Sequence, residues 1–491
     1  MIKKIALVRP GDYAEGLIIP LSLMYLAGYL RKYIQGIEFK VIDAPLDNLS
    51  GEQVARLVQE FNPDLVCLTG LSFHSPYVKE AAREIRKIIP LLPIVAGGAG
   101  VSSDPDDVLK EAAINYGVLK EGEKTFLELV EALNADNDPY LVKGLAYKNK
   151  NGKLIINPEQ PLVEEMDDIP FPAYDLIEVE KYFQSRKRTS QSPVYISKKL
   201  LPILTSRGCP FKCVFCHDTL GKDFRHRSPD NIVNEIVWLK EKYDLEELEI
   251  VDDIFNFNIQ HAKDVFRKLI DKKLGLKIAF PNGIKYEMID TELLHLFKQG
   301  GVYRIAFGIE SGDAQGQKLV RKKTNLQRMN EIIKEANEMG FFVSGFFQMG
   351  LPGETHEMIE NTINFAVGSN LHTAMFHITT PFPGTPMFKE HVENTILSGQ
   401  FNGSREDYEE KLRSGVNRRG NFRGEHGIPL NLSKVSDAEL IGLKRKAFAK
   451  FYFNPKRIFS LYRATPVKKR LVKNFINVCS EVILRKWLVQ A

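Results

Sequence analysis

The first 150 residues alternate short apolar runs with segments in which apolar residues recur every three or four positions. Short continuous apolar runs are typical of strands buried on both faces of a parallel sheet, and the longer period is typical of helices packed on it. Strands are expected at residues 4–8, 39–42, 65–69, 94–96 and 116–119, and helices at 21–33, 51–61, 77–89, 106–113 and 123–133. This pattern predicts an α/β, Rossmann-like doubly wound domain over residues 1–150.

A second alternation starts at residue 201 and contains six β/α units. Strands are expected at 201–205, 248–251, 277–280, 303–307, 341–349 and 373–379, and helices at 229–243, 260–271, 291–298, 326–339 and 356–367. Six units predict a partial (β/α)6 TIM-like barrel over residues 201–388, with its site at the carboxyl ends of the strands. Residues 151–200 are expected to form a linker, and residues 389–491 a mostly helical basic region.

Small residues follow the predicted strands of the first domain, where ligands bind on such sheets. They include Gly11, Gly70, Ser72 and the run Gly-Gly-Ala-Gly at 97–100. Small side chains at this edge would let a large flat ligand approach the backbone, and a helix-entry turn without a ligand is the alternative explanation of the run. It is not a dinucleotide fingerprint, because the first strand leads into Arg-Pro-Gly-Asp.

The loop after the first barrel strand carries three cysteines with the spacing C-x3-C-x2-C, namely Cys209, Cys213 and Cys216. Three thiolates on one loop can hold three irons of a [4Fe–4S] cluster and leave the fourth iron open, whereas ferredoxin-type sites use four cysteines. The alternatives are a Cys3His zinc site that uses His217, or unrelated buried cysteines. The remaining cysteines, Cys67 and Cys479, stand alone in apolar sequence.

Composition and charge are those of an ordinary globular protein with an uneven distribution of charge. The chain has 491 residues, of which 44% are hydrophobic and 26% are charged, as in ordinary globular proteins. We expect no secretory leader and no membrane-spanning segment, and the cysteine usage favours the cytoplasm. Residues 441–491 carry a net charge of +12, while the rest of the chain carries −7.

The basic C-terminus mixes cations with large apolar side chains, a composition that suits peripheral contact with an anionic membrane surface. Its aromatic residues include Phe448, Phe451, Tyr452, Phe459 and Tyr462, and its basic residues include Lys469, Arg470 and Lys473. The alternative is a solvated helical face that packs its aromatics on the barrel. Nucleic acid is not expected as a partner, because no RNA-binding motif accompanies the charge.

The cysteine loop resembles that of the radical S-adenosylmethionine (SAM) superfamily, including an aromatic residue, Phe215, before the last cysteine. The resemblance implies that SAM chelates the open iron. It also implies that one electron from the cluster cleaves a carbon–sulfur bond and produces a 5′-deoxyadenosyl radical, which removes a hydrogen atom from an unactivated position. Phe215 is thereby a candidate for the SAM site.

Further SAM contacts follow from the same resemblance. Asp252 and Asp253 end the second barrel strand, where polar groups meet the methionine amino group, although a solvated strand end or helix cap is the plain alternative. Glu310 ends the fourth strand and suits the ribose hydroxyls or the ammonium of SAM, unless it pairs with Arg304. Arg321 opens a basic run and offers a bidentate fork for the methionine carboxylate, unless the run is a solvated face.

The domain order, with Asp-Asp-x-Phe at 252–255 and the turns at 349–355 and 381–386, looks like the cobalamin-binding radical SAM family. The resemblance covers about residues 1–390 and implies a cobalamin site lined by Ser72, Gly97, Gly98, Ala99 and Gly100. The loop after the first strand, residues 11–16, lacks the His of the D-x-H-x-x-G cobalamin motif, so no protein imidazole is expected on the cobalt. His74 is a lone loop histidine and is expected to be unliganded.

These features predict a radical SAM C-methyltransferase that uses a [4Fe–4S] cluster, SAM and cobalamin, with no catalytic side chain assigned. A cobalamin-linked oxidative cyclase is the first alternative, and a non-enzymatic cobalamin or zinc scaffold is a remote one. A methylthiotransferase would need a second three-cysteine cluster upstream, where only Cys67 occurs. The expected partners are a small-molecule substrate, apolar or lipid-like if the membrane hypothesis holds, and an electron donor such as flavodoxin or ferredoxin.

Overall fold

The structure is a computed structural model that describes residues 1–11, 17–135, 137–185, 187, 190, 194–400, 403–417 and 430–468. The chain forms two compact units. The N-terminal unit comprises Met1–Thr189, His217–Arg227 and Phe382–Asn421, and the barrel unit comprises Ser190–Cys216, Ser228–Pro381 and Phe422–Ala491. Three features of the sequence lie outside the described residues: the loop at 12–16, Cys479, and the basic residues Lys469, Arg470 and Lys473.

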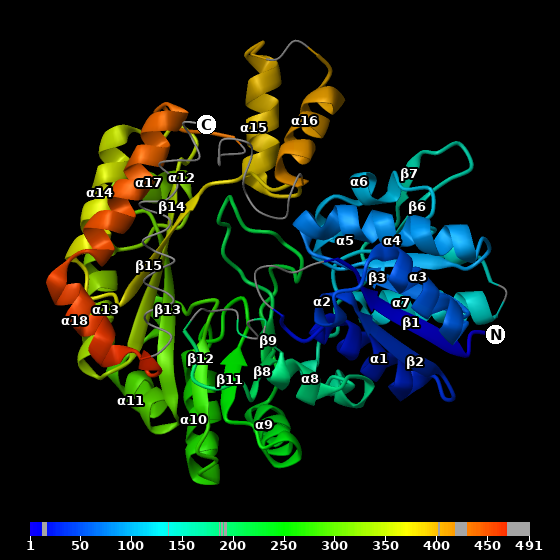
Figure 1. Ribbon diagram of the computed structural model, residues 1–491, viewed down its shortest axis with the longest axis horizontal. Coiled ribbons are helices and arrows are strands. Elements are labelled where there is room, and N and C mark those ends of the chain that lie inside the picture. The colour runs from blue at the N-terminus through cyan, green and yellow to red at the C-terminus, as the bar shows by residue number, and fades with distance from the viewer. Residues whose placement is uncertain are drawn as a thin grey trace. The chain divides into compact units, whose positions relative to one another are not determined.

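The N-terminal unit is built on a seven-stranded sheet of order β2-β1-β3-β4-β5-β6-β7 (Figure 1). Strands β1 to β5 pair in parallel, as the continuous apolar runs predict, and β6 and β7 add an antiparallel hairpin. The strands are β1 (Lys4–Arg9), β2 (Glu38–Asp43), β3 (Leu65–Thr69), β4 (Ile94–Gly97), β5 (Tyr116–Val118), β6 (Leu145–Lys148) and β7 (Leu154–Ile156). The predicted doubly wound fold is confirmed.

Two apolar layers hold helices on opposite faces of this sheet. One layer joins the strands to α3 (Gly51–Phe61) and α4 (Ser75–Ile88), and the other joins them to α1 (Leu21–Tyr33) and α7 (Gly122–Asn134). Helix α3 starts with a capping box, in which Ser50 and Gln53 satisfy each other's backbone N–H groups. The shorter helices are α2 (Ala44–Asp47), α5 (Ala99–Ser103), α6 (Pro105–Leu109) and α8 (Val179–Gln184). The carboxyl ends of β1, β3, β4 and β5 therefore share one edge.

The barrel unit contains six parallel strands in the order β15-β14-β13-β12-β11-β8 (Figure 1). They are β8 (Leu200–Ile203), β11 (Glu247–Ile250), β12 (Lys277–Phe280), β13 (Val302–Glu310), β14 (Phe342–Met349) and β15 (Thr373–Ile378). The helices are α9 (Pro229–Tyr243), α10 (Ile259–Lys272), α11 (Thr291–Gln299), α12 (Ala314–Leu319), α13 (Leu326–Glu338) and α14 (His356–Gly368). The expected partial (β/α)6 barrel is confirmed, and β13 runs on to Glu310 through an irregular register against β14.

The residues after the barrel are divided between the units. Helices α15 (Pro386–Leu397) and α16 (Arg405–Asn417) belong to the N-terminal unit, whereas α17 (Asp437–Tyr452) and α18 (Pro455–Ala464) belong to the barrel unit. Helix α17 packs on β15: the rings of Phe448 and Phe376 lie 5.4 Å apart, and the Tyr452 hydroxyl bonds the backbone of Ala374. None of the described helices has the length and apolar character that a membrane crossing requires.

Candidate active site

The cysteine loop extends from the carboxyl end of the first barrel strand through the short strand β9 (Ser206–Arg207). Cys213 is buried, Cys209 is partly exposed and Cys216 is exposed, so one side of the loop is open. The Cys216 N–H donates to the Cys213 carbonyl at 3.3 Å, and the Val214 N–H donates to the Val320 carbonyl at 3.4 Å. The loop therefore forms a turn attached to the segment after α12.

Two largely buried lysines, Lys285 and Lys322, place positive charge near Cys213. A hydrogen bond from Cys216, aided by the ammonium groups of Lys322 and Lys285, lowers the pKa of Cys213 to about 6. The Lys285 ammonium also lies 3.9 Å from the centre of the Phe211 ring, within the same loop. Because the thiolate is the form that binds metal, this environment favours ligation.

The arrangement fits an iron–sulfur cluster better than zinc. Among the described residues, no three His, Cys, Asp or Glu side chains converge on a point that could hold a single metal ion. A zinc ion needs its four ligands at one point, whereas each cysteine of a [4Fe–4S] cluster binds a different iron. His217, the fourth ligand of the zinc alternative, instead has Nδ1 at 2.9 Å from the Ser103 hydroxyl and Nε2 at 3.4 Å from the Ser72 hydroxyl.

Glu310 lies at the carboxyl end of β13 and forms a buried ion pair with Lys322 at 3.0 Å. The Lys322 ammonium also donates to the Gly308 carbonyl at 2.7 Å, and the Gln348 amide donates to the other Glu310 oxygen at 3.1 Å. Glu310 has a φ of +67°, which is unusual for a residue with a side chain. The salt bridge expected as the alternative is therefore present, but its cation is Lys322 and not Arg304, and Lys322 and Gln348 orient the carboxylate.

The two predicted aspartates have different environments. Asp252 is 2% exposed and accepts hydrogen bonds from the backbone and hydroxyl of Thr205, at 2.7 and 2.5 Å, and from the Ser206 hydroxyl at 2.6 Å. Burial raises its pKa to about 6 despite these bonds. Asp252 thus ties the end of β11 to the segment that leads into the cysteine loop. Asp253, the next residue, is exposed.

The other two predicted SAM residues have partly open positions. Phe215 is partly buried within the cysteine loop, and Arg321 is exposed at a φ of +54°. The sequence pointed to Arg321 within its basic run, whereas the structure pairs Lys322 with Glu310. Nothing in three consecutive bases distinguishes them. Only the turn, which leaves Arg321 and Lys323 exposed and buries most of Lys322, identifies the lysine that reaches Glu310.

Another turn of the barrel unit is held by a buried carboxyl group. Glu354 has no exposed surface, and one of its oxygens accepts from the N–H groups of Gly350 and Leu351 at 2.6 and 3.0 Å. Burial raises the pKa of Glu354 to about 7. The Gly-Leu-Pro-Gly-Glu turn singled out in the sequence therefore closes on its own glutamate.

The residues predicted to bind cobalamin lie on the carboxyl edge of the N-terminal sheet. Gly98 has a φ of +88°, and a Cβ there would lie 2.7 Å from the Thr69 hydroxyl. A Cβ at Gly100 would lie 2.9 Å from the Leu71 carbonyl. These two glycines are therefore required by the packing of the turn after β4 against the turn after β3.

Other positions on this edge leave room for a ligand. A Cβ at Gly97 would meet no atom closer than 3.8 Å, while Ser72 and Ala99 are partly exposed. Leu71 is 46% exposed, which is unusual for a large apolar side chain at the end of a buried strand. An open apolar and polar edge of this kind fits a large flat cofactor such as a corrin.

A buried network at the ends of β1 and β2 was not anticipated from the sequence. The Arg9 guanidinium donates to both Asp43 oxygens, at 2.7 and 2.6 Å, and the Tyr182 hydroxyl donates to the same carboxylate at 2.5 Å. Burial and the nearby Arg9 charge lower the pKa of His74 to about 3, so its imidazole is neutral. The two partners of the bidentate ion pair are 34 residues apart in the chain, which is why the sequence pattern alone did not pair them.

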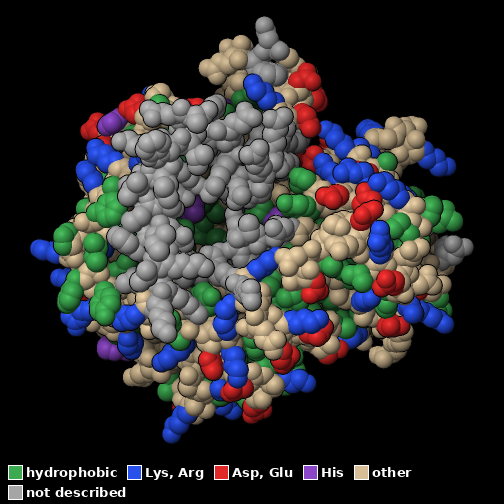
Figure 2. Space-filling view, viewed as in Figure 1, with side chains coloured by type: hydrophobic (Ala, Val, Ile, Leu, Met, Phe, Trp, Pro, Cys, Tyr) green, Lys and Arg blue, Asp and Glu red, His purple; other side chains and the backbone are tan. Residues whose placement is uncertain are grey.

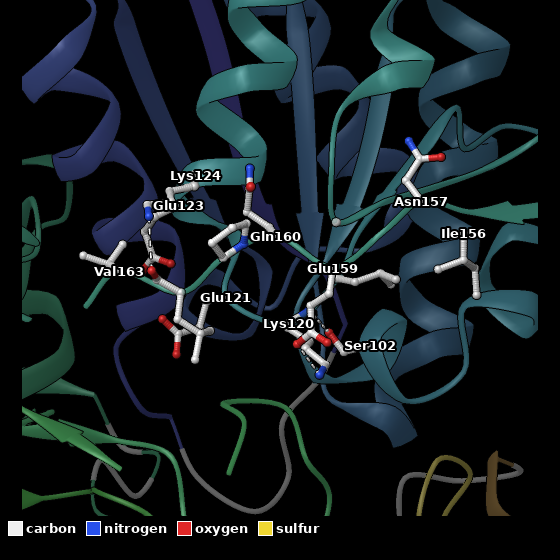
Figure 3. A pocket seen from close by; sticks show the side chains of 14 residues that line it. Ser102, Lys120, Glu121, Glu123, Lys124, Ile156, Asn157, Glu159, Gln160 and Val163 are labelled. Atoms are coloured by element: carbon white, nitrogen blue, oxygen red, sulfur yellow. Dashed lines mark hydrogen bonds and ion pairs between the residues drawn. The ribbon is translucent and has the colours of Figure 1, made fainter. Parts of the chain in front are cut away.

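A small pocket of about 150 Å³ lies at the start of α7 in the same unit (Figure 3). Its lining includes Ser102, Lys120, Glu121, Glu159 and Gln160. Lys120 pairs with Glu159 at 2.5 Å, and Glu121 pairs with Arg225. A drug-sized ligand fills roughly 300 Å³ or more, so this pocket is too small for a corrin.

Each of the two units contains a region that matches a known protein family. The B12 binding domain model matches residues 11–130, and the radical SAM superfamily model matches residues 203–366. An uncharacterized methyltransferase of Pyrococcus horikoshii is 30% identical over 442 residues, which cover 89% of this chain and 88% of the relative. The cytidylyl-2-hydroxyethylphosphonate methyltransferase of Streptomyces wedmorensis is 30% identical and covers 83% of each chain. The anaerobic magnesium-protoporphyrin IX monomethyl ester cyclase of Rubrivivax gelatinosus is 28% identical, over 79% of this chain and 70% of the cyclase.

A solved structure has the same fold. The radical SAM methyltransferase TsrM of Kitasatospora setae, with cobalamin and a [4Fe–4S] cluster bound, superimposes with a TM-score of 0.68 at 22% identity, over 80% of this chain and 78% of that one. The chain therefore belongs to the cobalamin-binding radical SAM enzymes, whose cofactors are a [4Fe–4S] cluster, SAM and cobalamin.

Proposed function

We propose that the chain is a C-methyltransferase that transfers a methyl group to an unactivated carbon of a small-molecule substrate. The observation that carries this proposal is the open cysteine loop beside the Glu310–Lys322 pair, at the carboxyl ends of the barrel strands, in a chain that matches methyltransferases over nearly its full length. When bound, the cluster and SAM supply the radical that activates the carbon, and cobalamin supplies the methyl group.

The chain's own residues hold and orient these groups in this proposal. Cys209, Cys213 and Cys216 hold three irons. Because the Asp252 carboxylate already accepts hydrogen bonds from three donors, it fixes the loop, and the exposed Asp253 is the aspartate that meets the methionine amino group. Glu310, paired with Lys322, receives the ribose hydroxyls of SAM.

The basic run after α12 supplies the methionine carboxylate contact in the same proposal. Lys322 is already fixed by Glu310 and the Gly308 carbonyl, so its ammonium needs little reordering to bind a carboxylate. Arg321 remains the alternative cation, and Phe215 packs beside the bound SAM. In the N-terminal unit, cobalamin is bound at the edge formed by Ser72, Gly97, Gly98, Ala99 and Gly100.

A cobalamin-linked cyclase is the second candidate, because the Rubrivivax gelatinosus cyclase is a relative over 79% of this chain. The two reactions differ in how they consume SAM. A methyltransferase uses SAM twice, once to methylate the reduced cobalt and once for the radical, whereas a ring closure needs only the radical. Methylation of the reduced cobalt can be measured without knowing the substrate.

Anaerobic, reduced protein loaded with cobalamin and incubated with SAM that carries a deuterated methyl group should form about one S-adenosylhomocysteine per cobalamin. The deuterated methyl group should appear on the cobalt by mass spectrometry. A matched sample without cobalamin should form none. Production of 5′-deoxyadenosine with neither S-adenosylhomocysteine nor a labelled methyl group would favour the cyclase and contradict methyl transfer.

We also propose that α18 contacts an anionic membrane surface. The aromatic side chains of α17 pack on β15, but those of α18 face solvent. Phe459 is 62% exposed and Tyr462 is 53% exposed, and they lie beside the cations Arg463 and Lys468. Apolar side chains lie next to basic ones over this helix at the left edge of Figure 2. A substrate delivered from that surface would be apolar. The electrons for the cluster would come from a separate donor protein such as a flavodoxin or ferredoxin.

Sedimentation with anionic liposomes tests the membrane contact. The full-length chain should bind at low salt and release at high salt, because each base near such a surface contributes about 1 kcal/mol. The double variant F459S/Y462S should lose binding, and Trp238→Ser, at another exposed aromatic residue, should not. Absence of binding at low salt, or equal binding by F459S/Y462S, would contradict the proposal.

A further inference from the structure

Within the N-terminal unit, His217, which directly follows the last cysteine, lies against Ser72 after β3 and Ser103 at the end of α5. The Ser103 hydroxyl lies 2.9 Å from His217 Nδ1, and the Ser72 hydroxyl lies 3.4 Å from His217 Nε2. The ring centres of His217 and Phe382 are 5.6 Å apart. His217 thus belongs spatially to the edge on which the candidate cobalamin residues lie, although it is encoded beside the cysteine loop.

The turn after the last barrel strand approaches the same point. Gly384 has a φ of +82°, and a Cβ there would lie 2.6 Å from the Ser103 carbonyl and 2.9 Å from its Cα. Only glycine allows that approach, which accounts for the glycine of the Pro-Phe-Pro-Gly-Thr-Pro sequence. Three segments that are more than 100 residues apart therefore meet around Ser103: the β4 turn, His217 and Gly384.

The hydrogen bonds determine which nitrogen of His217 carries the proton. The Ser103 hydroxyl has one hydrogen, and it donates that hydrogen to the Ala99 carbonyl at 2.6 Å. Ser103 can then only accept from His217, so Nδ1 is the protonated nitrogen. Nε2 carries the lone pair of the neutral ring, and its described polar neighbour is Ser72 at the long distance of 3.4 Å.

The place of this lone pair suggests its partner. The sheet order β2-β1-β3-β4-β5 directs ligands to the carboxyl edge of these strands, where Leu71 is 46% exposed and a Cβ at Gly97 would meet no atom within 3.8 Å. Cobalamin carries amide side chains around its corrin ring, and their N–H groups are donors. His217 Nε2, whose contact with Ser72 is long, is an acceptor at this edge that such an N–H group could reach.

We propose that His217 is a cobalamin-binding residue, whose Nε2 accepts a hydrogen bond from a corrin amide beside the Ser72 hydroxyl. Ser103 is a positioning residue that fixes the ring, and Gly384 allows the Pro381–Pro386 turn to support Ser103. The inference rests on the proposed cobalamin site at this edge. It adds a contact from the part of the chain that follows the cluster cysteines, outside the B12 binding domain match at residues 11–130.

Two substitutions at His217 separate a contact from a structural role. His217→Asn keeps a donor toward Ser103 and removes the acceptor at the Nε2 position, whereas His217→Phe removes both polar atoms. Each full-length variant is reconstituted with iron and sulfide, titrated with hydroxocobalamin by absorbance, and assayed for iron in the same sample. His391→Phe is the matched control, because His391 is a half-buried histidine of the same unit bonded to the Tyr408 hydroxyl.

Both His217 variants should bind hydroxocobalamin about fivefold more weakly, since a net hydrogen bond contributes roughly 1 kcal/mol and 1.4 kcal/mol is tenfold. Their iron content should match that of the wild type, and His391→Phe should bind as the wild type does. Wild-type affinity in His217→Asn would overturn the Nε2 contact, and joint loss of iron and cobalamin would show that His217 is only structural. Wild-type protein that binds no cobalamin would instead refute the cobalamin site itself.

Discussion

Replacing Cys209, Cys213 and Cys216 together with alanine should remove the iron–sulfur cluster and all cleavage of SAM. The wild-type chain, reconstituted without oxygen, should hold about four irons and the triple variant none, because each of the three thiolates binds one iron. The lysines beside Cys213 favour its thiolate, which is the form that binds iron. Iron and acid-labile sulfide analysis, with 5′-deoxyadenosine measured after reduction, checks both results.

Cys67→Ala is the matched control for this experiment. Cys67 is 2% exposed in the middle of β3, and burial raises the pKa of its thiol to about 12, so it neither ionises nor reaches solvent. The variant should keep its full iron content and its SAM cleavage. A cluster that survives in the triple variant would mean that the ligands lie elsewhere in the chain.

Much of the fold was predictable because β1 to β5 and the six barrel strands pair in parallel and are largely buried. A strand covered by helices on both faces must be apolar along its whole length, and strands such as Leu65–Thr69 meet this condition without interruption. The cysteine spacing predicted the cluster loop for a similar reason, because a loop that supplies three ligands keeps them close in sequence. Both the strands and the cysteine loop could therefore be predicted from residues that are close together in the sequence.

The residues that were missed depend on contacts between distant segments. Arg9 pairs with Asp43 through the register of β1 and β2, and His217 lies against Ser72 and Ser103, which are 145 and 114 residues away. The spacing of apolar and polar residues along the chain carries no information about such distant pairs. In both cases a polar residue beside a strand end or a ligand loop was visible in the sequence, but its partner became evident only in the folded chain.

The Glu310–Lys322 pair is the second point at which a large effect is expected. Burial lowers the pKa of Lys322, but the carboxylate of Glu310 and the nearby thiolate of Cys213 more than offset this, so the net shift is upward and the ammonium stays charged. Lys322→Met leaves the Glu310 carboxylate buried without its cation. Removal of one partner of a buried pair costs about 3–5 kcal/mol, so the variant should unfold at a Tm roughly 10 °C lower.

The same variant should bind SAM at least 100-fold more weakly if Lys322 holds the methionine carboxylate, as judged by equilibrium dialysis on cluster-loaded protein. The double variant K322M/E310Q, compared with E310Q alone, separates the two effects, because a neutral amide no longer needs a cation and E310Q alone reports the loss of the Glu310 contact to SAM. Its Tm should recover toward that of the wild type, while its SAM affinity should stay low. Arg321→Met removes an exposed cation one position earlier and should change both quantities little. A double variant that regains SAM affinity together with stability would restrict Lys322 to a structural role. A 100-fold loss in Arg321→Met would instead return the carboxylate contact to the residue that the sequence first suggested.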